Sequence, residues 1–440
     1  MSELTVKDTE ARKRLLSLFD EGTFTELDAF AKSANGEIEV VAGYGSVNGV
    51  YAYAFSQDIT VDGGAISVAQ CAKIKKIYEL AKKTGCPVIG IYDSNGMKLR
   101  EGFEALNAYG EILKASTSVS GVVLQISVVA GACLGTSALM ANMADVVIAV
   151  KEADFYITAP SEVKAEESFA QGTVDILADD VNSAIASVKN LVSVLPSNNL
   201  EAAPMFDFEE KLSYGADAYA SAKEIINAVA DENSVVEIKA GYADNAVTAF
   251  AQIAGSTAGV IAFDGESVCP SCAYKAEAFI KLCDAFNIPI VTFVHAKGLV
   301  KEKENQMLVA ATKLTSAYAT ATCPKISVIT GKAIGAAYIA LAGKGANADL
   351  VFAWDTAVVS PLEVDAAVAF LYNDRLAAGE NRAALEKEYE EELASPFTAA
   401  ACGAIDDIFV PAETRTKLIN ALSFLDSKRE NTIPRKHSVK

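Results

Sequence analysis

Hydrophobic and polar positions follow two different spacings along the chain, which predict helices that alternate with strands. In residues 71–83 (CAKIKKIYELAKK) and 275–286 (KAEAFIKLCDAF), apolar residues recur at helical spacing with lysines between them. Each of these segments leads into a mostly apolar run that ends in a glycine turn, at 84–96 (TGCPVIGIYDSNG) and 286–298 (FNIPIVTFVHAKG). Such runs are typical of buried strands, so the pattern predicts an α/β protein.

The same order of elements occurs twice, which indicates an internal duplication. Pro87 of the first apolar run matches Pro289 of the second. Further along, the glycine-punctuated run 131–145 (GACLGTSALMANMAD) matches 331–349 (GKAIGAAYIALAGKGANAD), and both runs end at an aspartate. The sequence therefore predicts two α/β domains of similar structure.

Each predicted domain also contains an upstream β-hairpin. Residues 43–58 (GYGSVNGVYAYAFSQD) and 251–265 (AQIAGSTAGVIAFDG) have the order strand, Asn-Gly or Ala-Gly turn, strand. Between the two halves, a mixture of Pro, Asn and Ser is typical of a linker. We predict an N-terminal domain at 1–200, a linker at 201–219 and a C-terminal domain at 220–440.

Composition and charge restrict the function classes. The chain has 440 residues, 51% of them hydrophobic, which favours two well-packed domains over one core. A net charge of -19 disfavours nonspecific binding to nucleic acid or to an anionic membrane, and an anionic ligand would need a local basic pocket.

Two segments bear on the cellular location. Residues 115–144 carry no charge, but their glycines and polar residues favour a buried strand, a turn and a helix over a membrane span. The N-terminal segment has charges throughout and no apolar core typical of a signal peptide, so we expect a cytoplasmic protein.

The glycine turns are candidate anion sites. Gly135-Thr136 and Gly335-Ala336 are predicted to lie where a helix begins, and the first N–H groups of a helix lack intrahelical partners. Together with the helix dipole, such groups stabilise negative charge, including a developing oxyanion. The alternative is that these small residues only allow strand and helix to pack closely.

Few side chains are available for other kinds of chemistry. With only His295 and His437, a histidine-based triad or a multi-histidine metal site is poorly supplied, and we expect no metal. His437 is expected to be solvated, whereas His295 is either structural or functional. The eight cysteines are expected to be reduced thiols. Cys269-Pro-Ser-Cys272 lacks the second pair of a zinc ribbon, and redox pairing of these two cysteines stays an open alternative.

Nearly the full length of the chain resembles one family. The matching segments, in order, are ARKRLLSLFDEGTFTELD, GYGSVNG, QDITVDGGAIS, KTGCPVIGIYDSNG, EGFEALNAYGEI, LVSVLPSNN, LCDAFNIPIVTFV, CPKISVITGKAIGAAY and EYEEELASPFTAAACGAIDDIFVPAETR. On these residues the chain resembles the carboxyltransferase subunits of biotin-dependent acyl-CoA carboxylases and decarboxylases, of the propionyl-CoA carboxylase β type. The resemblance implies a duplicated crotonase-like ββα superhelix of two domains.

The resemblance also implies an activity. Members of this family move a carboxyl group between N1 of biotin and the α-carbon of an acyl-CoA, and both partners pass through enolate-like states. By this resemblance, Gly135-Thr136 would hold the thioester oxygen and Gly335-Ala336 the ureido oxygen of biotin. Biotin, carried on a separate carrier protein, would itself serve as the base.

Partners follow from the same resemblance. It implies a homo-oligomer, a hexamer built as a trimer of dimers, with a biotin carboxyl carrier protein as its partner. A biotin carboxylase or a membrane decarboxylase subunit is a further partner that the family suggests.

Cofactor contacts are expected from two glycine turns and three lysines. Gly96 and Gly298 end the matching apolar runs, and the candidates for the coenzyme A phosphates are Lys73, Lys98 and Lys275. For each lysine the alternative is an ordinary solvated position.

The chain also departs from the family pattern at several places. It has Asp93 to Lys98 (DSNGMK) where the family has DSGGAR, and His295 to Leu299 (HAKGL) where the family has DVPGF. Thr136 replaces a glycine, and the segment between Lys164 and Gln171 is shorter than in the family.

A second hypothesis is therefore a structural or regulatory paralogue whose acyl site has drifted. A crotonase-like hydratase, isomerase or hydrolase is a third, weakened because no paired carboxylates flank the turns.

Overall fold

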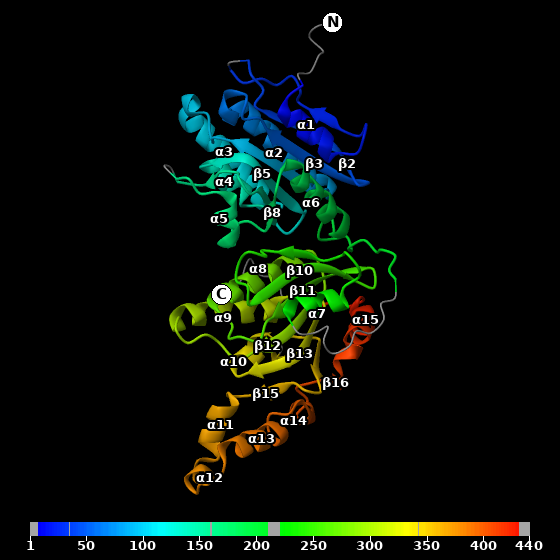
Figure 1. Cartoon of the computed structure of the whole chain (residues 1–440). Coiled ribbons are helices and arrows are strands. Elements are labelled where there is room, and N and C mark those ends of the chain that lie inside the picture. The colour runs from blue at the N-terminus through cyan, green and yellow to red at the C-terminus, as the bar shows by residue number, and fades with distance from the viewer. Residues whose placement is uncertain (1–7, 35, 159–160, 210–220, 342, 431–440) are drawn as a thin grey trace. The chain divides into compact units, whose positions relative to one another are not determined.

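The chain forms two compact units (Figure 1). The computed structural model describes residues 8–34, 36–158, 161–209, 221–341 and 343–430. Unit 1 ends at Pro204 and unit 2 begins at Met205. Residues 210–219 of the predicted linker lie outside the described residues, so its bounds, 201 and 219, stay a prediction.

Unit 1 contains an eight-stranded sheet within the described residues. Its strands are β1 (Thr25–Leu27), β2 (Val40–Val47), β3 (Val50–Gln57), β4 (Val88–Ser94), β5 (Gln125–Leu134), β6 (Val146–Val150), β7 (Phe155–Tyr156) and β8 (Ile176–Ala178). Its helices are α1 (Glu10–Leu18), α2 (Val68–Thr84), α3 (Gly102–Thr117), α4 (Thr136–Ala141), α5 (Ala165–Ala170) and α6 (Val181–Val194). The strand order is β1-β2-β3-β4-β5-β6-β8, with β7 paired to β5. The first three strands are antiparallel, and the pairs from β3 onward are parallel.

Unit 2 repeats this arrangement in the residues described. Its strands are β9 (Val236–Ile238), β10 (Ala246–Ile253), β11 (Ser256–Phe263), β12 (Ile290–Ala296), β13 (Lys325–Ile334), β14 (Leu350–Trp354), β15 (Val358–Ser360) and β16 (Asp407–Phe409). Its helices are α7 (Ala222–Val229), α8 (Pro270–Ala285), α9 (Glu304–Thr320), α10 (Ala336–Leu341), α11 (Val364–Leu371), α12 (Asn373–Ala377), α13 (Arg382–Glu392), α14 (Pro396–Ala401) and α15 (Thr414–Leu425). The order β9-β10-β11-β12-β13-β14-β16, with β15 paired to β13, matches unit 1 strand for strand. The predicted duplication is confirmed.

Local sequence explains the two hairpins. Asn48 and Gly49 both have positive φ, 49° and 82°, and they join β2 to β3. Ala254 and Gly255, at 52° and 76°, join β10 to β11. Two positive φ values in a two-residue loop are typical of the type I′ turn, whose twist matches that of the flanking strands. Both predicted hairpins are therefore present.

Burial follows the parallel part of each sheet. All seven residues of β4 (VIGIYDS) are buried, as expected for a strand covered on both faces. In unit 2, Val260, Phe293 and Val328 lie in a core that also contains Leu418 of α15. Helices α11 to α13 extend beyond the end of the sheet of unit 2 and have a smaller apolar cluster of their own (Figure 1).

The uncharged segment 115–144 folds as strand, turn and helix. It contains the end of α3, all of β5 and all of α4. Among the residues described, no helix is long and apolar enough to cross a membrane.

Candidate functional site

The two glycine turns of unit 1 lie beside each other at the carboxyl ends of neighbouring strands. Gly96 follows β4 and Gly135 follows β5, and these strands pair in parallel up to Ser94 and Cys133. A Cβ atom placed on Gly96 would lie 3.3 Å from the carbonyl oxygen of Leu134. The carboxyl end of a parallel sheet is where α/β proteins place their ligands, so this edge is the candidate site of unit 1.

Gly135 turns the chain from β5 into α4. It has φ +59°, a left-handed conformation that favours glycine, and its N–H donates to the carbonyl of Tyr156 in β7 over 2.9 Å. Because this N–H is used within the fold, the first donor available to a ligand is the N–H of Thr136, the first residue of α4.

Unit 2 has the same geometry at Gly335. Its φ is +57°, and its N–H donates to the carbonyl of Ser360 in β15 over 2.8 Å. Ala336, the first residue of α10, is exposed, whereas Thr136 is half-buried. The structure thus brings each predicted glycine pair to an equivalent strand-to-helix turn, with Gly298 following β12 as Gly96 follows β4.

The aspartates that end both glycine runs are structural. The carboxylate of Asp145 accepts the N–H of Gln125 over 2.8 Å, and that of Asp349 accepts the N–H of Lys325 over 2.7 Å. Each bond lies at the first residue of the strand that leads to the turn, β5 or β13. These aspartates therefore fix the start of the strand whose other end forms the candidate site.

Asp93 and His295 occupy equivalent positions in the two units. Asp93 forms an ion pair with Arg14 (2.6 Å) and lies against Gly131. The imidazole of His295 lies against Gly265 and Gly331, where a Cβ atom would come within 2.8 and 2.7 Å of ring atoms. Burial, with the nearby charge of Lys297, lowers the pKa of His295, so the ring is neutral at pH 7.

Two of the three predicted phosphate lysines are buried within the fold. Lys73 in α2 and Lys275 in α8 are each 2% exposed. Their ammonium groups donate to backbone carbonyls, of Val40 (3.3 Å) and Tyr242 (2.7 Å). Burial lowers the pKa of both, that of Lys275 to about 8. We correct the expectation accordingly: these lysines satisfy carbonyl groups inside the units and are not placed to contact a phosphate.

Lys98 also has an internal role. It forms ion pairs with Glu39 (2.7 Å) and Asp62 (2.8 Å), and the side chain of Glu39 is fully buried. It therefore neutralises a buried carboxylate beside the Gly96 turn, which does not favour a contact with coenzyme A.

We expect Lys98→Met to destabilise unit 1 by about 3 kcal/mol, because it leaves Glu39 as an uncompensated buried charge. Ser67 still donates to Glu39 (3.3 Å), which keeps the cost at the lower end of the range for such pairs. Hydrogen exchange of unit 1 measures the change. Lys75→Met, which removes an exposed pair with Glu111, is the control and should change the stability of unit 1 far less than Lys98→Met. Equal effects of the two variants would contradict the buried-pair interpretation.

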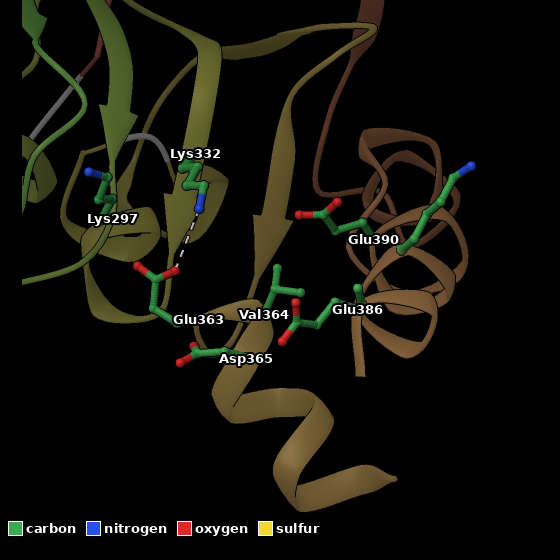
Figure 2. A pocket seen from close by; sticks show the side chains of 9 residues that line it. Lys297, Lys332, Glu363, Val364, Asp365, Glu386 and Glu390 are labelled. Atoms are coloured by element: carbon green, nitrogen blue, oxygen red, sulfur yellow. Dashed lines mark ion pairs between the residues drawn. The ribbon is translucent and has the colours of Figure 1, made fainter. Parts of the chain in front are cut away.

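Unit 2 contains a charged groove that is lined in part by Lys332 of β13, the strand that leads to the Gly335 turn. Its cavity of about 600 Å³ is lined by Lys297, Lys332 and acidic residues that include Glu363. Figure 2 shows Lys332 and Glu363 facing each other, 3.8 Å apart. Sequence reasoning missed these lysines. Lys332 directly follows Gly331 inside the repeated glycine run, and this position was a signal that it lies near the candidate site.

A second groove in unit 2 is apolar. It has a volume of about 490 Å³ and includes Ala336 itself, with Leu299 and residues of α9 and α10. Such a surface beside a backbone N–H donor suits an apolar ring or chain that carries a polar oxygen at one end. No group of metal-ligating side chains occurs among the described residues, and His437 lies outside them.

The structure thus defines a duplicated α/β protein with a glycine turn into a short helix at equivalent strand ends of both units. Comparison with known proteins identifies the family: residues 7–439 match the model of the carboxyl transferase domain. The chain belongs to this family.

Full-length relatives agree with this assignment. The chain is 36% identical to the methylmalonyl-CoA decarboxylase subunit alpha of Veillonella parvula, over 97% of this chain and 92% of the relative. It is 35% identical to the propionyl-CoA carboxylase beta chain of Saccharopolyspora erythraea, over 97% and 89%. The solved transcarboxylase 12S structure, a hexamer assembly with methylmalonyl-coenzyme A bound, superposes with a TM-score of 0.92 at 32% identity, covering 98% of this chain and 92% of that one. The predicted family and the crotonase-like fold class are confirmed.

Proposed function

We propose that this chain transfers a carboxyl group between biotin, carried on a separate protein, and the α-carbon of an acyl-CoA. The observation that carries this proposal is the duplicated turn: Gly135-Thr136 in unit 1 and Gly335-Ala336 in unit 2 present equivalent N–H donors at the starts of short helices. A transfer in which two different carbonyl oxygens gain negative charge requires two such sites.

Each turn has one task in this mechanism. The N–H of Thr136 stabilises the oxygen of the thioester when the α-carbon acts as an enolate, and the N–H of Ala336 stabilises the ureido oxygen of biotin when N1 gains or loses the carboxyl group. Gly135 and Gly335 do not donate to the substrates, because their N–H groups bond to Tyr156 and Ser360, but they set the backbone conformation. When bound, biotin would supply N1, the atom that carries the carboxyl group.

The apolar groove beside Ala336 supports the assignment of biotin to unit 2. Its walls, formed by Leu299, Ile339 and small residues of α9, suit the uncharged bicyclic ring better than a polyphosphate. Gly298 belongs to the turn that begins this wall. A methylmalonyl-CoA decarboxylase subunit and a propionyl-CoA carboxylase chain are among the relatives, so a short acyl-CoA is the substrate class that we propose.

We further propose that the chain assembles as a hexamer, because the related transcarboxylase 12S does so. A biotin carboxyl carrier protein would be its partner. A biotin carboxylase or a membrane decarboxylase subunit would complete the enzyme, according to the direction of the reaction.

The proposal is tested by carboxyl transfer from malonyl-CoA, methylmalonyl-CoA and glutaconyl-CoA to free biotin or to a biotinylated carrier. We expect transfer from at least one of these donors, measured as biotin-dependent formation of the decarboxylated acyl-CoA. A correctly assembled oligomer that transfers from none of them would refute the proposal for short acyl-CoAs.

The position of His295 favours a second candidate function, a structural or regulatory paralogue. Its ring lies against Gly331, in the strand that leads to the Gly335 turn, where the family pattern has an aspartate. Binding of an acyl-CoA without turnover, measured by calorimetry beside the transfer assay, would support this second function.

A further inference from the structure

The start of α8 contains a cysteine pair that the carboxyl-transfer proposal does not use. Cys269 is the N-cap of this 16-residue helix, Pro270 is its first residue, and Cys272 lies at its third position. The N–H of Cys272 donates to the Sγ atom of Cys269 over 3.1 Å. The Sγ atom of Cys269 thus caps the N-terminus of the helix, and the two cysteines have the Cys-X-X-Cys spacing of thiol–disulfide oxidoreductases.

The duplication shows that helix capping does not require these cysteines. The equivalent helix of unit 1, α2, has Ser67 as its N-cap, and the hydroxyl of this serine accepts the N–H of Gln70 over 3.4 Å. Serine is a preferred N-cap residue, whereas cysteine is not among the residues favoured there. Unit 1 therefore forms this cap with Ser67 and Gln70, whereas unit 2 has a cysteine at both equivalent positions, Cys269 and Cys272.

Exposure differs between the two thiols in the way that a redox pair needs. Cys269 is partly exposed, whereas Cys272 is 1% exposed. An attacking thiol must be reachable by its substrate, and a resolving thiol must be shielded from competing reagents. All eight cysteines of the chain are free thiols in the structure, so both members of the pair are available.

The local electrostatics agree with this division of roles. A hydrogen bond from the thiol of Cys272 and bonds from the backbone N–H groups of Cys272 and Ser271 lower the pKa of Cys269. The same thiol–thiol bond and burial raise the pKa of Cys272, although Lys275 on the next turn acts in the opposite direction. A thiolate on Cys269 is the nucleophile in thiol–disulfide exchange.

We propose that Cys269 and Cys272 form a redox-active dithiol that exchanges with the disulfides of low-molecular-weight thiols. The thiolate of Cys269 attacks one sulfur of the substrate disulfide, which breaks the S–S bond, forms a mixed disulfide and releases one thiol. Cys272 then loses its proton, attacks the Sγ atom of Cys269 and releases the second thiol. Two electrons pass from the dithiol to the substrate disulfide, so one intramolecular disulfide and two substrate thiols are formed. This exchange does not depend on the proposed carboxyl transfer.

A redox titration of the full-length protein tests the proposal. The protein is equilibrated with a series of ratios of oxidised to reduced glutathione, quenched in acid, alkylated and digested with trypsin. Cleavage after Lys239 and Lys275 yields one peptide, 240–275, that contains both cysteines of the pair and no other cysteine. We expect this peptide to become two hydrogen atoms lighter and resistant to alkylation as the ratio rises, while Cys402, an exposed single thiol, forms only mixed disulfides.

Two serine variants separate the roles of the thiols. Cys272→Ser should accumulate the mixed disulfide on Cys269, whereas Cys269→Ser keeps the cap, as Ser67 does in unit 1, and should leave Cys272 reduced. At pH 6.5 iodoacetamide should alkylate Cys269 about tenfold faster than Cys402, because of the larger thiolate fraction. The proposal is overturned if peptide 240–275 stays fully alkylatable at every ratio, or if Cys269 and Cys402 form mixed disulfides alike without an intramolecular bond.

Discussion

Replacement of Gly335 by tryptophan is expected to reduce biotin-dependent carboxyl transfer by at least about 100-fold, the effect of losing one oxyanion donor. Gly335 has φ +57°, which L side chains rarely adopt, and a Cβ atom there would lie 3.1 Å from the carbonyl oxygen of Pro361. The indole would also lie beside the N–H of Ala336. It would close the end of the apolar groove that Ala336 lines. The variant therefore removes both the donor and the space for the biotin ring.

The measurement compares initial rates of carboxyl transfer to a biotinylated carrier, with circular dichroism and oligomer mass as checks of folding. Gly379→Trp is the matched control, because Gly379 also has positive φ, +89°, but has no atom within 4 Å of a Cβ position. It carries a similar backbone strain without a role in the site and should keep its activity.

Binding of acyl-CoA separates the two turns further. In our proposal the thioester is held by unit 1, so Gly335→Trp should bind acyl-CoA as the unmodified protein does, by calorimetry, while its transfer is lost. Transfer at the normal rate in Gly335→Trp would contradict the assignment of the unit 2 turn to biotin. If both tryptophan variants fail to fold, the loss of carboxyl transfer in Gly335→Trp results from backbone strain and not from the loss of the oxyanion donor.

Most of the fold could be predicted from the sequence because it rests on local patterns that occur twice. Asn48-Gly49 and Ala254-Gly255 specify their hairpins through two positive φ values, and the apolar runs before Gly96 and Gly298 specify buried parallel strands. The partners of the glycine turns could not be predicted. Gly135 and Gly335 bond to Tyr156 and Ser360, which lie in strands of two and three residues that are too short for a periodic signal.

The lysines show a different limit of sequence reasoning. Helical spacing correctly placed Lys73 and Lys275 on helices, but a charged residue was expected to face solvent or a phosphate. In the structure Lys73 lies one turn before Ile77, and Lys275 one turn before Phe279, on the buried faces of their helices. That spacing was visible in the sequence. The backbone carbonyls that accept hydrogen bonds from these lysines could not be predicted, because Val40 and Tyr242 are distant along the chain.

Removal of Asp231 is expected to have the largest effect on stability. Its carboxylate binds Arg415 of α15 (2.6 Å) and accepts the N–H groups of Ala254 (3.2 Å) and Gly255 (2.7 Å) in the hairpin turn. Arg415 and Asp231 are each about a tenth exposed, so Asp231→Ala leaves a buried guanidinium without its anion and two N–H groups without their acceptor. We expect a loss of about 5 kcal/mol in the free energy of unfolding of unit 2, at the upper end for a broken buried pair.

Trp354 provides a direct measurement of this loss. It is the only tryptophan of the chain, it is buried in β14, and its Nε1–H donates to Thr414, the residue before Arg415. Its fluorescence during urea unfolding therefore reports unit 2, even when the two units unfold separately. Arg382→Ala, which removes an exposed pair with Glu386 in the same unit, is the control and should change stability by less than about 1 kcal/mol. A midpoint for Asp231→Ala that moves no further than that of Arg382→Ala would show that α15 and the hairpin are held together by the apolar packing that includes Leu418, and not by this ion pair.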